Sequence, residues 1–257
     1  MALILEQSDH LWRRRPLKNQ INQKTRSMKT IGLIGGMSWE SSKVYYQYLN
    51  EIVRDTLGGS HSAKVILSSV DFAEIERLSF ADDWDQIGNL MAIEAQRLEK
   101  AGADIILLGT NTIHLVSDAI TRATNIPFLH IAEATGAAIV EQGLKKIALL
   151  GTQFTMEKDF YSKILEQDFG LEVVTPELKD RVKLHNIIYN ELVKGVFAEA
   201  SKEACLKMIQ KLTGQGIEGV ILGCTELPIL IPTNEVGLPS FDTTKIHVTA
   251  AIEHALS

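Results

Sequence analysis

Two apolar runs that end in glycine constrain the fold of this chain more than any other feature. DIILLGTNTIH at residues 104–114 aligns with GVILGCTE at 219–226, and their glycines, Gly109 and Gly223, lie 114 residues apart. Each run is long and apolar enough to form a buried strand of a parallel sheet. In such a sheet, functional groups lie where strands end and helices begin. The alignment therefore predicts two similar strand ends, each followed by polar residues.

A second pair of segments repeats at almost the same spacing. KTIGLIGG at 29–36 resembles KKIALLGT at 145–152, and Gly35 lies 116 residues before Gly151. Buried parallel strands look alike, so either pair alone could arise without a common origin. Two pairs at nearly one spacing indicate a duplicated, domain-sized unit, because the period is too long for a solenoid repeat.

The remaining pattern alternates between strands and helices, which predicts parallel sheets with helices on both faces. Expected strands cover residues 30–36, 64–72, 104–109, 125–131, 145–151, 171–175 and 218–223. Expected helices cover 39–57, 83–101, 113–122, 132–143, 156–169, 181–195, 199–214, 226–231 and a stretch that begins near Asp242 or Thr243. The predicted fold class is α/β, with two pseudo-symmetric Rossmann-like domains and the active site in the cleft between them. The first expected domain is 28–125 plus 240–257, and the second is 126–239.

Composition and charge exclude several classes of protein. Of the 257 residues, 45% are hydrophobic and 23% charged, as in ordinary globular proteins. No run approaches the roughly 20 apolar residues that cross a membrane, and a net charge of −6 does not favour nucleic-acid binding. The two cysteines form no CxxC or zinc pattern, so we expect a reducing, cytoplasmic location. Residues 1–27 carry a net charge of +4 and no signal-peptide core, and we expect a disordered basic extension there.

Cys224 is the most reactive-looking residue of the pattern, because it follows a strand end at the start of an expected helix. The free N–H groups and the dipole of a helix N-terminus favour a thiolate. Thr110 occupies the matching position of the first half. A thiolate can act as a base near neutral pH, whereas a threonine hydroxyl would have to donate or relay a proton through a hydrogen-bond network. Two such groups facing one cleft suit proton transfer at a carbon next to a carboxylate.

Several familiar sites do not occur in the sequence. GLIGGMSWESS is neither a dinucleotide-binding loop nor a Walker loop, although its N–H groups and the Ser38 hydroxyl suit a carboxylate. HExxH, clustered His and Cys ligands and GxSxG are missing, so no metal is implied. We expect the scattered histidines to be structural or exposed, Cys205 to pack in the core, and Asp242 to cap a helix.

Five motifs in order carry a more specific resemblance: MKTIGLIGGMSWESS, GTNTIH, IPFLHIAEAT, LLGTQFTM and GCTELPIL. From Met28 onwards the chain resembles the aspartate/glutamate racemase family, whose members need no pyridoxal phosphate or other cofactor. The resemblance implies racemisation of aspartate or glutamate by two acid/base residues, one from each domain. The C-terminal cysteine of the family matches Cys224, and the N-terminal one matches Thr110. A Thr/Cys pair resembles the subgroup specific for the L isomers, in which Cys224 removes the α-proton and Thr110 returns one from the opposite face.

The resemblance also implies contacts with the substrate. Positions that match the family's pocket are Met37, Ser38, Asn111, Thr112, Thr225 and Glu226. Thr152 is the second-half counterpart of the first glycine turn, and Lys183 matches a lysine that pairs with a carboxylate, although a solvated helix charge is an equal alternative. Many relatives hold the distal carboxylate with Arg or Gln at a position that falls near Ser79 here, with Arg77 close by. The chain departs from the family where side-chain specificity is decided.

Two other functions stay open at this stage. Arylmalonate-type decarboxylases share the fold and keep only the C-terminal cysteine, so a single-cysteine decarboxylase or isomerase is one alternative, although GGMSWESS favours the racemases. A non-catalytic amino-acid-binding protein is the other. The expected partner is a small dicarboxylic amino acid, with no nucleic acid and no membrane, and the family implies a homodimer.

Overall fold

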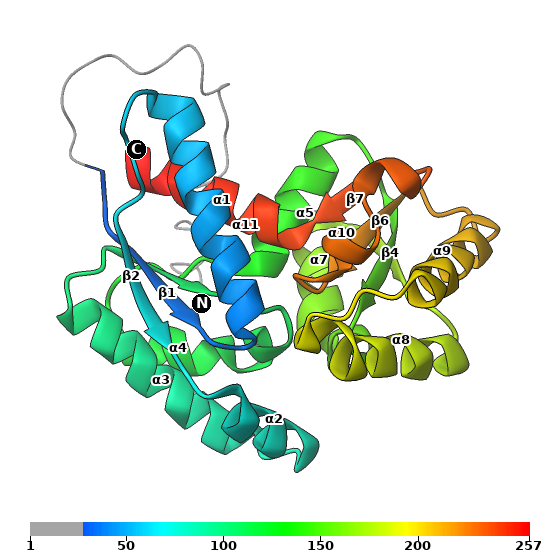
Figure 1. The fold of residues 1–257 in the computed structure, drawn as a ribbon, viewed down its shortest axis with the longest axis horizontal. Coiled ribbons are helices and arrows are strands. Elements are labelled where there is room, and N and C mark those ends of the chain that lie inside the picture. Colours follow the sequence, from blue (N-terminus) through cyan, green and yellow to red (C-terminus); the bar gives the residue numbers. More distant parts are fainter. Residues whose placement is uncertain (1–27) are drawn as a thin grey trace.

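The computed structural model describes residues 28–257, and the basic extension predicted at 1–27 lies outside the described residues. Within the described part, two parallel sheets form, with strand orders β2-β1-β3 and β5-β4-β6-β7. Their strands are β1 (Ile31–Gly35), β2 (Val65–Ser69), β3 (Ile105–Leu108), β4 (Lys146–Gly151), β5 (Glu172–Val174), β6 (Gly219–Gly223) and β7 (Ser240–Asp242). Figure 1 shows the two sheets side by side, each flanked by helices.

The α-helices follow the strands in the alternation that the sequence predicts. They are α1 (Trp39–Leu57), α2 (Phe72–Phe80), α3 (Trp84–Lys100), α4 (Ser117–Ala123), α5 (Ile131–Glu141), α6 (Gln153–Glu157), α7 (Asp159–Phe169), α8 (Leu178–Asn190), α9 (Glu199–Thr213), α10 (Leu227–Leu230) and α11 (Thr243–Leu256). Short 3₁₀ turns are η2 (Thr112–Val116), η3 (Leu192–Lys194) and η4 (Thr233–Glu235). No helix among the described residues is long and apolar enough to cross a membrane.

The two sheets share one topology, as the duplicated sequence segments predict. The order β2-β1-β3 corresponds to β5-β4-β6, with the strand nearest the start of each half in the middle. In the second sheet Gly151 pairs in register with Gly223. In the first, the N–H of Gly109 donates to the carbonyl of Ile34 at 2.8 Å. Each sheet therefore brings its two glycine turns side by side at one edge.

The strand expected at 125–131 is reduced to a single parallel bridge between Ile106 and Phe128. Pro127 has no N–H to donate, which prevents a longer ladder. Its carbonyl accepts from the N–H of Ile106 at 2.8 Å, and the N–H of Leu129 donates to the carbonyl of Ile106 at 3.1 Å. The segment lies beside β3 as β7 lies beside β6, so it is the shortened counterpart of β7.

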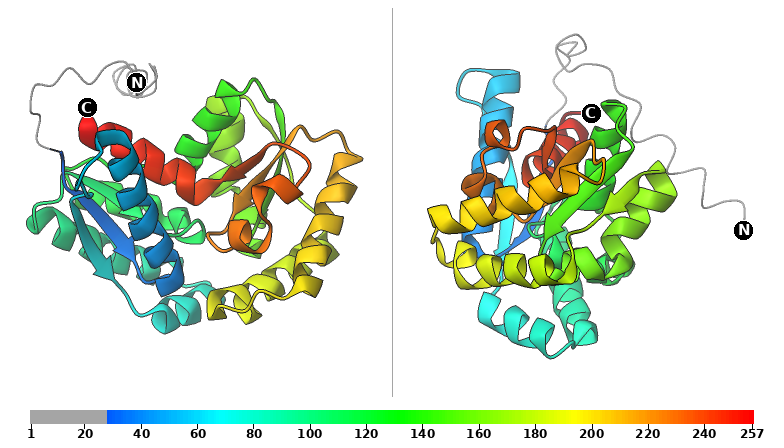
Figure 2. Two further views of the ribbon diagram at one scale, coloured as in Figure 1. Left: turned by 45° about the horizontal axis from the view of Figure 1, so that its top comes forward. Right: turned by 90° about the vertical axis from the view of Figure 1, so that its right-hand side faces the viewer.

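The C-terminal segment is shared between the halves. β7 pairs with β6 in the second sheet, which differs from the predicted assignment of residues 240–242 to the first domain. α11 then crosses back, and its apolar face (Val248, Ala251, Ile252 and Ala255) packs in one core with β1 and α1. Figures 1 and 2 show α11 running between the two sheets. As predicted, Asp242 caps α11 by accepting from the N–H of Lys245 at 3.0 Å.

Two local predictions were wrong, and one on packing is confirmed. The strand expected to reach residue 72 ends at Ser69, and α2 follows with Asp71 as its cap, which accepts from the N–H of Ala73. A helix of nine residues contains too few apolar positions for the helical spacing to be recognised in the sequence, especially directly after a strand. The helix expected at 156–169 is divided into α6 and α7. Cys205 is fully buried in the core of the second half, as predicted.

Candidate active site

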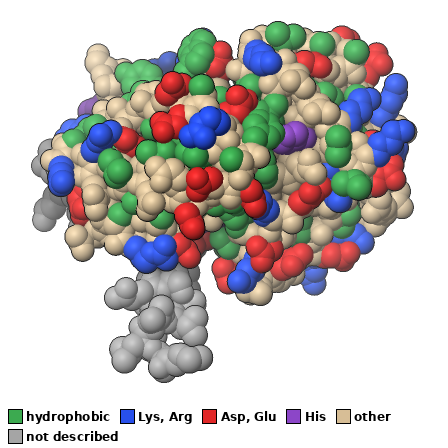
Figure 3. All heavy atoms as spheres, turned by 90° about the horizontal axis from the view of Figure 1, so that it is seen from below, with side chains coloured by type: hydrophobic (Ala, Val, Ile, Leu, Met, Phe, Trp, Pro, Cys, Tyr) green, Lys and Arg blue, Asp and Glu red, His purple; other side chains and the backbone are tan. Residues whose placement is uncertain are grey.

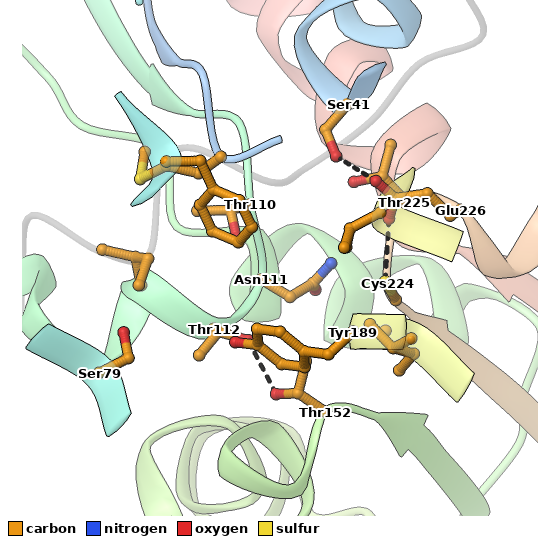
Figure 4. Close-up of a pocket in the computed structure, with 16 residues that line it drawn as sticks. Ser41, Ser79, Thr110, Asn111, Thr112, Thr152, Tyr189, Cys224, Thr225 and Glu226 are labelled. Carbon is orange, nitrogen blue, oxygen red and sulfur yellow. Dashed lines mark hydrogen bonds between the residues drawn. The ribbon is translucent and has the colours of Figure 1, made fainter. Parts of the chain in front are cut away.

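A cavity of about 470 Å³, including its opening to solvent, lies between the two halves where their strands end. The first half contributes Met37, Ser41, Phe72, Ser79, Thr110, Asn111, Thr112 and Ile113. The second contributes Thr152, Ile188, Tyr189, Val193, Gly223, Cys224, Thr225 and Glu226. Figure 4 shows Thr110 and Cys224 on opposite sides of this space. The fold thus brings both members of the predicted pair to one cavity.

Most of the residues matched to the family's pocket line this cavity: Met37, Ser79, Asn111, Thr112, Thr152, Thr225 and Glu226. Ser38 is buried just behind the wall, where it contacts Glu226. Lys183 is not brought to the cavity. It lies exposed on α8, facing solvent, which agrees with a solvated helix charge.

The Glu226 carboxylate joins the thiol to the first half of the molecule. Cys224 Sγ donates to Glu226 Oε2 at 3.0 Å. On its other oxygen, Oε1, the carboxylate accepts from Ser38 Oγ at 3.0 Å and from Ser41 Oγ at 2.9 Å. Ser38 caps α1, so its turn does attract a carboxylate as predicted, but that carboxylate is the protein's own Glu226.

The predicted thiolate at Cys224 is wrong for the resting site. Burial of the thiol, followed by the charge of Glu226 and the hydrogen bond to it, raises the pKa of Cys224 well above its usual value. The N–H groups of Glu226 and Leu227 act in the expected direction and lower it, but they are outweighed. Because α10 has four residues, it offers little helix dipole to the thiol. Cys224 rests as a neutral thiol whose proton points at a carboxylate.

Thr110 has a different environment. Its carbonyl accepts from His114 Nδ1 at 2.7 Å, and His114 Nε2 accepts from the N–H of Ile131 at 3.2 Å. These bonds select the neutral imidazole with its proton on Nδ1. No hydrogen bond joins the Thr110 hydroxyl to another side chain of residues 28–257, so of the two expected routes, direct donation and a relay, these residues form no relay. The backbone of Thr110 is held while its hydroxyl faces the cavity unassisted.

Three buried histidines, His114, His130 and His247, form a histidine cluster beneath Thr110. The ring centres of His114 and His130 lie 4.6 Å apart, and those of His114 and His247 5.7 Å. Burial, then the neighbouring His247, lowers the pKa of His130 to about 3. Burial likewise lowers the pKa of His247 to about 4. Burial keeps all three neutral at pH 7, and this is compatible with the structural role that the sequence predicts for them.

Hydroxyl and amide groups line the centre of the cavity. Thr112 Oγ1 lies 2.8 Å from Thr152 Oγ1 and 3.3 Å from Thr155 Oγ1, so one hydroxyl cluster spans both halves. Asn111 Nδ2 donates to Thr243 Oγ1 at 3.1 Å, while Asn111 Oδ1 is buried without a hydrogen-bond partner in the described part of the chain. A buried acceptor of this kind is costly unless a ligand completes it.

An aromatic cluster next to the cavity joins the two halves, and its member Tyr189 lines the cavity. Phe80 of α2 lies 5.2 Å from Tyr189 of α8 and 6.3 Å from Phe154 of α6, measured between ring centres. Lys158 pairs with Asp82 at 3.0 Å beside these rings. Figure 2 shows α2 next to the end of α8, and Figure 3 shows hydrophobic side chains gathered where the halves meet.

Several residues that line the cavity could not be predicted from the sequence. Ser41 lies three residues after Ser38, on the face of α1 that meets Glu226, and only the helical spacing within MSWESS could have indicated it. The others are Phe72 of α2, Ile188 and Tyr189 of α8, and Val193 of the turn η3 that follows α8, and their positions depend on the packing of the two halves. No group of three or more His, Cys, Asp or Glu side chains in the described part is arranged to hold a metal ion.

A model of the Asp/Glu/Hydantoin racemase family matches residues 34–251. The chain is similar to a crystal structure of a candidate Asp/Glu racemase from Yersinia pestis, with 48% identity, 90% of this chain and 100% of that one covered, and a TM-score of 0.83. An aspartate racemase homologue from Pyrococcus horikoshii gives 38% identity, the same coverage and a TM-score of 0.78. The broad specificity amino-acid racemase RacX of Bacillus subtilis is 25% identical over 83% of this chain and 92% of its own length. By its fold, its cleft and these likenesses, the chain is an amino-acid racemase and belongs to the Asp/Glu/Hydantoin racemase family.

Proposed function

We propose that the chain interconverts the L and D isomers of an α-amino acid without a cofactor, with Cys224 and Thr110 acting on opposite faces of the α-carbon. One observation carries this proposal: the thiol of Cys224 donates to a carboxylate at 3.0 Å in the cavity that Thr110 faces from the other side. A positioned acid and base on two faces is the arrangement that inverts a carbon centre through a planar carbanion.

The first step forms the base from the resting thiol. The Sγ proton moves along its hydrogen bond to Glu226 Oε2, which leaves a thiolate. The thiolate then takes the α-proton of the L isomer, and the electron pair of the broken C–H bond spreads into the substrate carboxylate. Thr110 gives its hydroxyl proton to the opposite face. Solvent returns that proton to Thr110 and takes one from Glu226, so the cycle closes without net consumption of protons.

The polar groups between the pair suit the two ends of an amino acid. Hydroxyl donors from Thr112 and Thr152 are placed to bind the substrate carboxylate, where negative charge grows as the α-proton leaves. The unpartnered Asn111 Oδ1 is an acceptor for the substrate ammonium group. This assignment leaves the substrate side chain in the part of the cavity between α2 and α8.

Cys224 and Thr110 differ in how well their surroundings support proton transfer to and from the α-carbon. Cys224 has a carboxylate to receive its proton, whereas Thr110 has no side-chain partner among residues 28–257 to restore its own. We therefore expect exchange of the α-proton of an L-amino acid to exceed its conversion to the D isomer.

Proton NMR in D₂O, with chiral chromatography of the same samples, tests the proposal on a panel of L-amino acids without pyridoxal phosphate. Aspartate and glutamate belong to the panel because they appear in the names of relatives. The α-proton signal is expected to disappear faster than D product forms, and Cys224→Ser is expected to abolish both. Exchange that survives Cys224→Ser would refute the role of the thiol, and Thr110→Val separates the second face from the first.

The family also suggests a homodimer in the cytoplasm, and both remain part of this proposal. Light scattering on the purified full chain tests the first, and a monomer at micromolar concentration would contradict it. Cell fractionation tests the second.

A further inference from the structure

The charge of the cavity wall does not suit a substrate with two carboxylates. Among the described residues, no lysine or arginine lines the cavity, and its one ionisable side chain of either sign besides Cys224 and Tyr189 is the carboxylate of Glu226. The two cations that the sequence places nearby, Arg77 on α2 and Lys183 on α8, are exposed and are not part of the lining. A distal carboxylate would enter this space without a partner of opposite charge.

The wall between α2 and α8 is apolar or neutral. Phe72, Ile188 and Val193 present hydrocarbon surface. Ser79 already donates its hydroxyl to the carbonyl of Ile75 at 2.8 Å. Figure 4 shows Ser79 on the far side of the cavity from Cys224 and Glu226.

Tyr189 adds a phenol that stays protonated. Burial is the main cause that raises the pKa of Tyr189 above its usual value, and the neighbouring acidic groups Cys224 and Glu76 act in the same direction. A phenol O–H can donate one hydrogen bond to a neutral polar side chain, but it cannot neutralise a carboxylate. The carboxylates that act on this wall are those of Glu76 and Glu226, whereas the cations Arg77 and Lys183 lie exposed outside the cavity lining.

We propose that the preferred substrate carries an uncharged side chain instead of the second carboxylate that the family resemblance implies. This inference rests on the proposed function, because it assumes that Cys224 and Thr110 hold the α-carbon. Burying an unpaired carboxylate in such a wall is strongly unfavourable, while an amide or alkyl group of the same size loses no charge solvation. Selectivity then arises from rejection of charge at the α2–α8 wall.

Asparagine against aspartate, and glutamine against glutamate, are matched pairs that differ in charge and hardly in shape. The full chain is assayed for kcat/KM of α-proton exchange in D₂O with each L isomer. Each amide is expected to exceed its acid by at least about tenfold. An acid that equals or exceeds its amide would overturn the inference and leave the proposed function intact. Exchange with none of the four, nor with alanine, serine or methionine, would overturn the proposed function and this inference with it.

Installing a cation provides the complementary test. Ser79→Arg places a cation at the position where relatives carry Arg or Gln. Because Ser79 is buried, this variant can fail to fold. Val193→Lys is therefore the companion variant, since Val193 is half-buried in the same wall. Val193→Met is the matched control, with similar length and no charge. Val193→Lys is expected to raise the ratio of aspartate to asparagine activity at least about tenfold over Val193→Met. An unchanged ratio in both folded cation variants would contradict the assignment of the side chain to this wall.

Discussion

Replacing Glu226 by Gln should separate two roles that the carboxylate combines. Glutamine keeps the shape of the side chain and can still accept from Ser38 and Ser41, but it carries no charge beside Cys224. The thiol should ionise more readily because a major cause of its raised pKa is removed. The α-proton exchange of L substrates should nevertheless fall, because an amide cannot receive the thiol proton. Reactivity of the cysteine and turnover are expected to move in opposite directions.

The size of the first effect follows from the contact itself. Two unit charges about 4 Å apart repel by about 4 kcal/mol at an effective dielectric constant of about 20, which is about a thousandfold in the ionisation of Cys224. A less basic thiolate is also a weaker nucleophile, and with a Brønsted slope of about 0.5 this offsets about thirtyfold. The net expectation is alkylation about thirtyfold faster at pH 7.

Alkylation by iodoacetamide, followed by intact-mass spectrometry, measures this rate. The only other cysteine is Cys205, which is fully buried and whose pKa burial raises to about 12, so a single adduct reports on Cys224. Ser41→Ala is the control, since it removes one donor to Glu226 and keeps the charge. Alkylation of Glu226→Gln at or below the wild-type rate would refute the account of the thiol. If exchange rose together with alkylation, Glu226 would raise the pKa without receiving the proton.

Three further outcomes follow from the structure. Thr110→Cys should raise the ratio of D product to α-proton exchange at least about tenfold by chiral chromatography, because a thiol is a far stronger acid than an unassisted hydroxyl; no gain would show that the faces are assigned wrongly. The histidine cluster binds protons near pH 6.5 only when unfolded, so the free energy of unfolding should fall from pH 6.5 towards 4 by about 1.4 kcal/mol per pH unit for each histidine; urea titrations at pH 7, 6 and 5 would contradict this if they coincided. Gly36→Ala should lower the free energy of unfolding by more than about 2 kcal/mol, because the φ of Gly36 is +93° and a Cβ would lie 2.2 Å from a backbone oxygen. Gly58→Ala is the control, since Gly58 has a φ of +75° and open space around it, and it should lower the free energy clearly less. Thermal unfolding of both variants measures the difference, and equal losses would contradict the prediction.

Much of the fold could be predicted because its strongest signals are local. β1, β4 and β6 are fully buried or nearly so, and their apolar runs end at Gly35, Gly151 and Gly223, of which the last two pair in register. The prediction of a strand at 125–131 was wrong in its length, because the apolar run does not show how many hydrogen bonds to the neighbouring strand remain once a proline interrupts it. Residues 240–242 were predicted to belong to the first domain, but they form β7 of the second sheet. A strand of three residues has no sequence pattern that indicates which sheet it joins.

The site could be predicted where it lies directly after those strands, and not elsewhere. Thr110 and Cys224 follow the ends of two matched strands, so one alignment places both at the cavity. The ionisation of Cys224 could not be predicted, because it depends on burial and on the rotamer of Glu226. Tyr189 reaches the cavity only through the contact of α8 with α2, which no spacing in the sequence reveals.

The hydrogen bonds from Ser38 and Ser41 to Glu226 also link the position of the Glu226 side chain to the contact between the two halves. Ser38 caps α1 and Ser41 lies in its first turn in one half, whereas the carboxylate follows β6 in the other half. Any separation of the halves that admits substrate and breaks these bonds frees Glu226 to swing away from Cys224. The acceptor of the thiol proton is then in position only after the halves have come back together. In the proposed mechanism, formation of the base would therefore depend on the contact between the two halves that these bonds make.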